Sequence, residues 1–515
     1  MKRYRLLKFV FIGLLITFMF GSCTEKFEEV NTDPRVLSEL DPASMGNLFG
    51  FAQYYALNVK RPQLPEVLFA DHFSQYYANI AAYFRQDMYH FDGGWGDICW
   101  KEFYGRGGPG HLADLIEMTD PVENPGYEAM HAVAQVFSVV MYERISSYFG
   151  PVPVSEAGNA KSSVMYDDVE TIYKNFFTTL DDALATLSNY AGGNAFGTND
   201  QIFAGDINNW ILFANTLRLR IAMRISDVEP ALAQTEAEQA VADGVMTAND
   251  HNAVFHTTEN SWNGIHRIIP WNEFRMSATM ESVMKGYNDP RIDQFWTPAV
   301  ADGEIRGLRN GYTPVELSRP ELTIDTLSIL GPRWAYDNRN DNPKDVMTCP
   351  EAYFLRAEGA MKGWNMGGTA EEFYNTGIAM NMEFWGITDA EVIAAYQQST
   401  DVPVATHDSP EPVSDIPVLF NTGDNAIALE QIATQKWLAL FPNGVEAWAD
   451  IRRSELPKMY PRMNTENPDI AVDEMPRRIP FSPYEYDVNA PAIEDALAKL
   501  GGPDKANVRL WWDPQ

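Results

Sequence analysis

Positive charge is scarce in this sequence. Its 515 residues include 39 Lys and Arg against 71 Asp and Glu, which gives a formal net charge of −32 at pH 7. Because binding to phosphate backbones needs clustered Lys and Arg, this balance excludes a generic nucleic-acid-binding protein. Hydrophobic residues make up 45% of the chain and aromatic residues 12%, which excludes a disordered chain. The length is that of one large domain or of two to three small ones.

Cysteine is also rare, with three in the whole chain. A chain of this length can bury a large core, so it needs neither disulfides nor metal ions to fold. Cys99 and Cys349 both lie among apolar residues. Two interpretations stay open: they pair in an oxidising compartment, or they are two buried thiols.

Long apolar runs are missing except near the N-terminus. Four basic residues fall within the first eight positions, and a run of twelve apolar or small residues follows, from Phe9 to Phe20. This run is too short to span a bilayer, so residues 1–22 are predicted to be a secretory signal. Small residues directly before Cys23 resemble a bacterial lipoprotein cleavage site, which predicts acylation of Cys23 as the lipid anchor. The alternative is ordinary signal cleavage with an incidental Cys23 thiol.

Helical spacing of apolar residues dominates the rest of the chain. It predicts helices over six ranges, which are 127–147, 167–189, 207–226, 350–364, 370–386 and 425–441. Short breaks such as Gly367-Gly368 separate consecutive helices, as in tetratricopeptide-like hairpins, although no regular repeat can be read. We therefore predict residues 23–45 to be an acylated cysteine and acidic linker, and 46–515 to be a single, mainly all-α domain. Long loops rich in Gly, Pro and aromatic residues interrupt the helices, and loops of that length are usually functional.

Motifs for catalysis are mostly absent. The sequence has no P-loop, no H-E-x-x-H and no G-x-S-x-G motif. Residues 105–110 match G-x-G-x-x-G, but the residues before them have helical spacing, which predicts a turn between two helices. Asp337 to Asp345 offers oxygen ligands for Ca²⁺, yet the spacing is not that of an EF-hand, and a solvated loop is the preferred interpretation. No cofactor and no catalytic residue are predicted, although a glycosidase carboxylate pair could not be recognised among so many acidic residues.

Eight segments, in order along nearly the whole mature chain, resemble the SusD/RagB family of outer-membrane nutrient-binding lipoproteins, and most closely its SusD-like branch. The segments are Asn31–Pro34 (NTDP), Tyr142–Pro153 (YERISSYFGPVP), Trp210–Ser226 (WILFANTLRLRIAMRIS), Asp289–Arg291 (DPR), Glu351–Trp364 (EAYFLRAEGAMKGW), Glu430–Arg453 (EQIATQKWLALFPNGVEAWADIRR), Pro476–Arg478 (PRR) and Leu510–Asp513 (LWWD). The resemblance implies an irregular tetratricopeptide-like helical scaffold with long loops that bind the ligand.

Most side chains in these segments are expected to hold the fold rather than touch a ligand. The tryptophans on apolar helix faces are expected in the core; they are Trp210, Trp364, Trp437 and Trp448. The arginines of two segments are expected to pair with buried carboxylates such as Glu358 or Asp450, because the guanidinium group suits bidentate pairing. They are Arg218, Arg220, Arg224, Arg452 and Arg453.

Aromatic residues in three loops are the candidate ligand site. The apolar face of a sugar ring stacks on flat aromatic rings, while its hydroxyl groups need amides, carboxylates or Arg, and ligand pockets generally combine such groups. The predicted platforms are Tyr83, Tyr89, Trp95, Trp262, Trp271, Trp334 and Tyr336. The predicted polar contacts are Asn79, Arg85 and Arg333.

The resemblance implies capture without turnover. We expect a lipoprotein of the outer membrane, facing the cell exterior, that binds oligosaccharides and delivers them to a SusC-like TonB-dependent barrel. Two alternatives remain: the same architecture capturing peptides or another nutrient, and a lipid-anchored glycosidase on a helical scaffold.

Overall fold

The computed structural model describes residues 42–513 except 92, 106–107, 159–160 and 162. The predicted signal, Cys23 and the Asn31–Pro34 segment lie outside the described residues. The helices are α3 (Pro42–Ala56), α4 (Asp71–Phe73), α5 (Gly93–Phe103), α6 (Gly108–Met118), α7 (Glu128–Phe149), α8 (Val169–Ser188), α9 (Ile207–Arg224), α10 (Pro230–Asp243), α11 (Ile265–Ile268), α12 (Ala278–Gly286), α13 (Ile292–Phe295), α14 (Pro314–Leu317), α15 (Cys349–Met361), α16 (Ala370–Phe384), α17 (Ala390–Gln397), α18 (Asn425–Leu440), α19 (Gly444–Ser454), α20 (Pro483–Val488) and α21 (Ala490–Leu500). The chain divides into two units, residues 1–45 and 46–515, and the second unit holds these helices from Gly46 of α3 onward.

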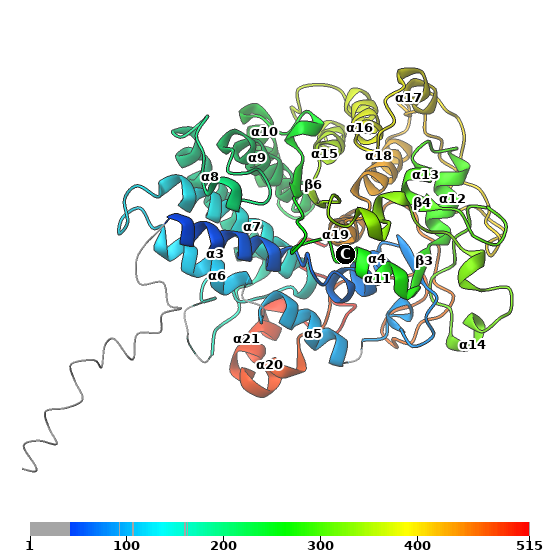
Figure 1. The fold of residues 1–515 in the computed structure, drawn as a ribbon, viewed down its shortest axis with the longest axis horizontal. Coiled ribbons are helices and arrows are strands. Elements are labelled where there is room, and N and C mark those ends of the chain that lie inside the picture. The colour runs from blue at the N-terminus through cyan, green and yellow to red at the C-terminus, as the bar shows by residue number, and fades with distance from the viewer. Residues whose placement is uncertain (1–41, 92, 106–107, 159–160, 162, 514–515) are drawn as a thin grey trace, which may run out of the picture. The chain divides into compact units, whose positions relative to one another are not determined.

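All six helices predicted from periodicity are present, as α7, α8, α9, α15, α16 and α18 (Figure 1). Their starts follow from local sequence. Asp168 accepts a hydrogen bond from the backbone N–H of Thr171 at the start of α8, and Thr369 and Glu372 form a capping box at α16. Such caps satisfy backbone donors that the first helical turn leaves free.

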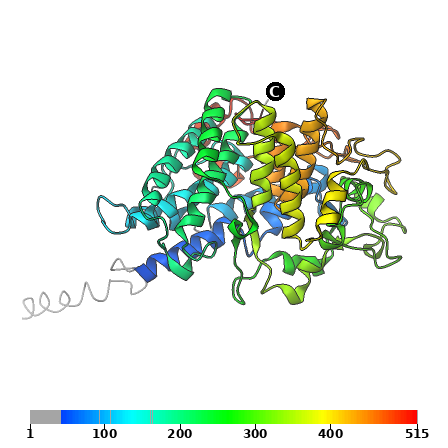
Figure 2. The same cartoon turned by 90° about the horizontal axis from the view of Figure 1, so that it is seen from above.

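The long helices pack as successive antiparallel hairpins. α7 packs on α8, α9 on α10 and α15 on α16, while α9 also contacts α15. Figure 2 shows the yellow and orange helices α15, α16 and α18 beside the cyan and green ones, α7 to α10. Close packing requires a glycine in α16, because a Cβ at Gly377 would lie 2.8 Å from Cζ of Phe354 in α15. The helix-hairpin architecture expected from the sequence is confirmed.

The core contains three of the four tryptophans expected there. Trp210, Trp437 and Trp448 are buried. The prediction for Trp364 is wrong, because α15 ends at Met361 and the chain turns through Gly363 at φ +80°, which leaves Trp364 beyond the helix and partly exposed.

Buried ion pairs join the hairpins to one another. Arg220 of α9 makes a bidentate pair with Glu351 of α15, at 2.6 Å for both bonds. Arg453 pairs with Glu358 at 2.7 Å and with Asp450 at 3.0 Å. Burial raises the pKa of Asp450, but the charges of Lys436 and Arg453 outweigh it and hold that pKa below its ordinary value. These contacts confirm the expected pairing.

Arg452 does not pair with a carboxylate as expected. Its guanidinium group donates to the backbone carbonyls of Ser147 and Arg477, and it lies 3.7 Å from the ring centroid of Trp448. Burial lowers the pKa of this guanidinium group. The adjacent Arg453 takes the carboxylate partners, because consecutive helical residues face different neighbours.

Among the described residues, six short strands form two-stranded antiparallel sheets within the loop regions. The strands are β1 (Tyr77–Asn79), β2 (Ala253–Phe255), β3 (Phe274–Met276), β4 (Trp296–Thr297), β5 (Ile329–Leu330) and β6 (Lys344–Met347). β1 pairs with β3, β2 with β6 and β4 with β5. These pairs connect loops that are far apart in the sequence.

Neither Cys99 nor Cys349 forms a disulfide; both are buried thiols. Burial raises the pKa of both. Across residues 42–513 as described, no helix has the length and apolar character needed to cross a membrane.

Candidate functional site

Strand pairing brings the three predicted loops together. Asn79 of β1 lies opposite Phe274 of β3, so the loop after β1 begins beside the loop that ends at Glu273. Phe255 of β2 lies opposite Lys344 of β6, so the loop after β2 begins beside the loop before β6. The segment 256–273 therefore connects both sheets and contacts the other two loops. We call this the loop surface, made of residues 80–91, 256–273 and 331–343.

At the β1–β3 end of the loop surface, two aromatic side chains are open to solvent. Tyr83 is 67% exposed and Trp271 is 48% exposed. The Tyr83 hydroxyl donates to Oε1 of Glu273 at 2.8 Å, and Gln63 donates to the other carboxylate oxygen. The hydrogen bond to Glu273 raises the pKa of Tyr83. An orientated phenol and carboxylate next to an open indole suit a ligand with both an apolar face and hydroxyl groups.

At the β2–β6 end, Trp262 and Tyr336 meet edge to face. Their ring centroids are 6.2 Å apart with an interplanar angle of 82°. The guanidinium carbon of Arg267 lies 5.1 Å from the Trp262 ring centroid, and that of Arg339 lies 4.3 Å from the Tyr336 centroid. Tyr336 remains 51% exposed and Trp262 partly exposed. The stacked arginines fix the rings and add hydrogen-bond donors beside them.

Three predicted site residues are buried instead. Trp334 packs between Trp385 and Phe441, and the Tyr89 hydroxyl donates to the backbone carbonyl of Glu474. The Asn79 amide is used by its own turn, where it donates to the carbonyls of Ala81 and Phe84. With no free ring face or amide, these residues are no longer expected to touch a ligand.

The remaining predicted residues make contacts within the protein. Arg85 is exposed and pairs with Glu466, while Arg333 pairs with Asp345 at 2.7 Å and stacks on Trp385. Trp95 is partly exposed and belongs to α5, where Phe84 meets it edge to face at 5.7 Å. Arg85 and Arg333 lie within the loop surface and Trp95 lies just after its first segment, and the contacts of all three support it.

The residues missed by sequence reasoning are Glu273, Arg267 and Arg339. Glu273 ends a loop that had been singled out for its aromatics, and the two arginines lie close in sequence to chosen aromatics. A search for charged residues close in sequence to the chosen aromatics would have found them. The described part of the chain holds no cluster of three or more His, Cys, Asp or Glu able to bind a metal ion.

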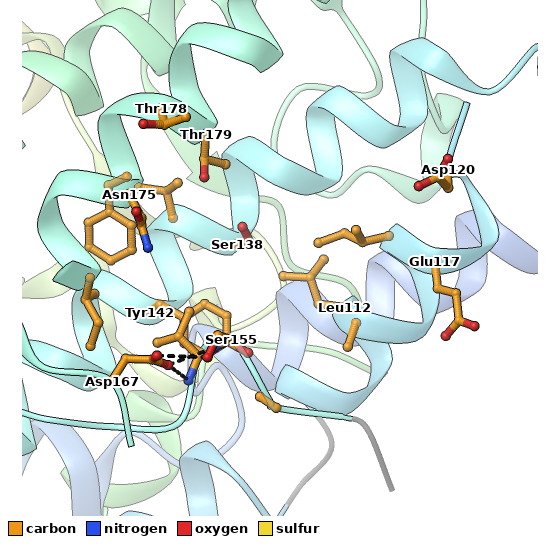
Figure 3. A pocket seen from close by; sticks show the side chains of 17 residues that line it. Leu112, Glu117, Asp120, Ser138, Tyr142, Ser155, Asp167, Asn175, Thr178 and Thr179 are labelled. Carbon is orange, nitrogen blue, oxygen red and sulfur yellow. Dashed lines mark hydrogen bonds between the residues drawn. The ribbon is translucent and has the colours of Figure 1, made fainter. Parts of the chain in front are cut away.

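A separate cavity of about 630 Å³ lies among α6, α7 and α8 and contains none of the predicted site residues. Leu112, Ile116, Val139 and Phe176 line its wall, and Figure 3 shows Asn175, Thr178 and Thr179 of α8 across from Glu117. Asp167 accepts from the backbone N–H groups of Val154 and Ser155 and from the Ser155 hydroxyl, so its oxygens are already used. The cavity has no exposed aromatic platform, because Tyr142 and Phe176 are buried.

Comparison with known proteins identifies the family. The model of the SusD-like family, described as SusD and RagB outer membrane lipoproteins, matches residues 40–513. The chain belongs to the SusD-like family. No curated relative matches it. Proteins of this family are binding proteins associated with the outer membrane.

Solved structures of SusD-like proteins share the fold over almost the whole chain. A chitin-binding SusD homologue from Flavobacterium johnsoniae is 33% identical, with a TM-score of 0.82, and the match covers 91% of this chain and 99% of that one. A SusD-like protein from Bacteroides thetaiotaomicron is 31% identical, with a TM-score of 0.81 and coverage of 92% and 99%. A SusD homologue from Bacteroides ovatus is 29% identical, with a TM-score of 0.82 and the same coverage.

Proposed function

We propose that this SusD-like protein is a lipid-anchored receptor on the outer face of the outer membrane, where it captures oligosaccharides without cleaving them. The observation that carries the proposal is the open aromatic set of the loop surface: Tyr83, Trp262, Trp271 and Tyr336. Rings that stay exposed beside orientated polar groups provide stacking faces and hydroxyl partners for sugars. The Flavobacterium johnsoniae homologue is described as chitin-binding, which supports the same ligand class.

The first expected result is saturable glycan binding with no product. The full chain, purified in detergent, is titrated calorimetrically with chito-, malto-, cello-, xylo- and manno-oligosaccharides, with oligogalacturonate and with a tryptic peptide digest. Each mixture is then analysed by chromatography for new products. Binding of at least one glycan series without cleavage supports the proposal. Cleavage that a single Asp or Glu substitution abolishes would instead establish a glycosidase.

Peptide capture is the second candidate, and the α6–α8 cavity favours it. Its aliphatic wall and the carboxylates of Glu117 and Asp120 suit a side chain with an apolar stem and a positive end. Binding of the digest alone, weakened by Glu117→Gln with Asp120→Asn, would support this candidate and contradict glycan capture.

We further propose that the protein delivers its ligand to a SusC-like TonB-dependent barrel. A capture protein held by a lipid anchor cannot by itself move its ligand across the membrane, so a channel has to receive it. A tagged chain expressed in its native host and solubilised in mild detergent is expected to co-purify with a large outer-membrane barrel. Recovery of the tagged protein alone, from cells where the barrel is present, would count against the partnership.

A further inference from the structure

A groove of about 330 Å³ lies beside the loop surface and was not expected from the sequence. Its lining residues come from α3, from the turn 199–201 and from the segment 255–261; they are Asn47, Gly50, Phe51, Tyr54, Asn199, Gln201, Phe255, Asn260 and Ser261. This volume is within the range of small-ligand pockets.

Hydrogen bonds between distant segments hold the walls of the groove in place. The backbone N–H of Gln201 donates to Oε1 of Gln53 in α3 at 2.9 Å, and Gln53 donates to Asp200 at 2.8 Å. The backbone N–H of His256 donates to the carbonyl of Gln201 at 2.7 Å. Because three segments meet at Gln201, the groove is formed before any ligand arrives, which reduces the entropy cost of binding.

Aromatic rings form one side of the groove. Phe51 is 55% exposed, so it offers an open face, and Tyr54 also lines the groove, with its ring centroid 6.3 Å from that of Phe255. An exposed Phe on a helix is common, but here it borders a hollow lined by hydrogen-bonding groups. An apolar ligand face placed on Phe51 would therefore have polar partners within the same groove.

The polar lining is uncharged, and three of its side-chain amides make no hydrogen bond within the described part of the chain. None of the nine lining residues is charged, although the chain carries a net charge of −32. The three amides are those of Asn47, Asn199 and Asn260. Each amide offers two donors and an acceptor. An uncharged ligand rich in hydroxyl or acetamido groups matches these groups, whereas a charged ligand would lose hydration without gaining a counter-charge.

The groove is continuous with the loop surface. Ser261 lines the groove and is followed by Trp262, a platform of the loop surface. Arg267 lies near both places. Its charge opposes the rise that burial causes in the pKa of Tyr54, a residue of the groove, and its guanidinium group stacks on Trp262. Gly264 allows this close approach, because a Cβ there would lie 2.4 Å from the carbonyl oxygen of Lys60, just after α3.

We infer that the groove is a second carbohydrate subsite, which binds uncharged sugar units of a chain whose other end lies on the loop surface. This inference rests on the proposed function. It makes affinity depend on chain length, since only a longer oligosaccharide can occupy both places at once, and the second contact then costs little additional entropy.

The test compares the Phe51→Ala, Asn47→Ala double variant with the wild-type full chain, since both residues lie in α3 and outside the loop surface. The ligands are the dimer, tetramer and hexamer of whichever uncharged series binds best in the titration survey. The hexamer is expected to bind wild type about tenfold or more tightly than the dimer, and the double variant is expected to lose most of that difference while its dimer affinity stays unchanged. Tyr484→Ala, which changes an exposed aromatic residue outside the groove, is the matched control and should behave as wild type.

Three other outcomes of this experiment would each contradict either the subsite or the proposed function. Glycan binding whose length dependence is the same in the double variant and the wild type rejects the groove but leaves the proposed function standing. Binding of oligogalacturonate alone also rejects an uncharged subsite. Absence of binding to every glycan rejects the proposed function, and the subsite with it.

Discussion

Replacing Arg291 with methionine is expected to lower the free energy of unfolding by about 3–5 kcal/mol, because it leaves a carboxylate buried without its counter-charge. Both side chains of the Arg291–Asp289 pair are fully buried, with Nη2 to Oδ2 at 2.6 Å. Arg291 also donates to Asn381 of α16 and to Gln435 of α18, and the Tyr396 hydroxyl of α17 donates to Asp289. One guanidinium group thus connects three helices to the segment before α13.

Urea denaturation of three variants measures this effect. Arg291→Met alone should be the least stable, and combining it with Asp289→Asn should recover part of the loss because no uncompensated charge then remains buried. Lys505→Met is the control, since it breaks an exposed pair with Asp469 and is expected to cost less than about 1 kcal/mol. If Arg291→Met costs no more than Lys505→Met, the buried pair does not stabilise the fold.

The helical scaffold could be predicted because its signals are local. Apolar spacing and capping residues such as Asp168 and Thr369 lie within the helix that they specify or directly before it. One failure has a local cause that periodicity does not include. Trp364 continues the apolar spacing of α15, but the helix stops at Met361 and Gly363 turns the chain at φ +80°. The other failure depends on a contact that is not local. Arg452 and Arg453 look equivalent in sequence, and only the packing of α19 against α15 places Glu358 beside Arg453 rather than Arg452.

The loop residues show even more clearly that local patterns can be predicted from the sequence and non-local contacts cannot. A sequence of alternating aromatic and polar residues selects the loops near the site but does not say which rings are buried. Trp334 is covered by Phe441 and Trp385, which are 107 and 51 positions away in the chain. The groove beside α3 could not be predicted at all, because its residues come from three segments that hydrogen bonds through Gln201 bring together.

Removing Trp262 and Trp271, the two tryptophans of the loop surface that solvent reaches, is expected to have the largest effect on binding. A sugar that covers about 50–100 Å² of an indole face gains about 1–2.5 kcal/mol at ~25 cal/mol per Å² of buried apolar area. Trp271→Ala alone should therefore weaken glycan binding by about tenfold, and Trp262→Ala with Trp271→Ala by about a hundredfold or more. Calorimetric titration of the full chain with the best-binding glycan measures both changes.

The neighbours of each ring make the two single variants differ in a predictable way. Trp262 contacts Tyr336 and Arg267, so Trp262→Ala removes a platform and also releases two side chains that it holds. We therefore expect Trp262→Ala to weaken binding more than Trp271→Ala, and Tyr336→Ala added to Trp262→Ala to cost less than it does alone.

Measuring the stability of each variant distinguishes the loss of a ligand contact from the loss of the fold. Substitutions at exposed positions usually change the free energy of unfolding by less than about 0.5 kcal/mol, so Trp271→Ala should melt at the wild-type temperature. Trp334→Ala is the opposite control, since truncating a buried tryptophan costs about 3–5 kcal/mol, yet the variant molecules that remain folded should bind with wild-type affinity. Wild-type affinity in the Trp262→Ala, Trp271→Ala double variant would show that the ligand binds elsewhere, whereas weak binding with an unchanged melting temperature places it on the loop surface.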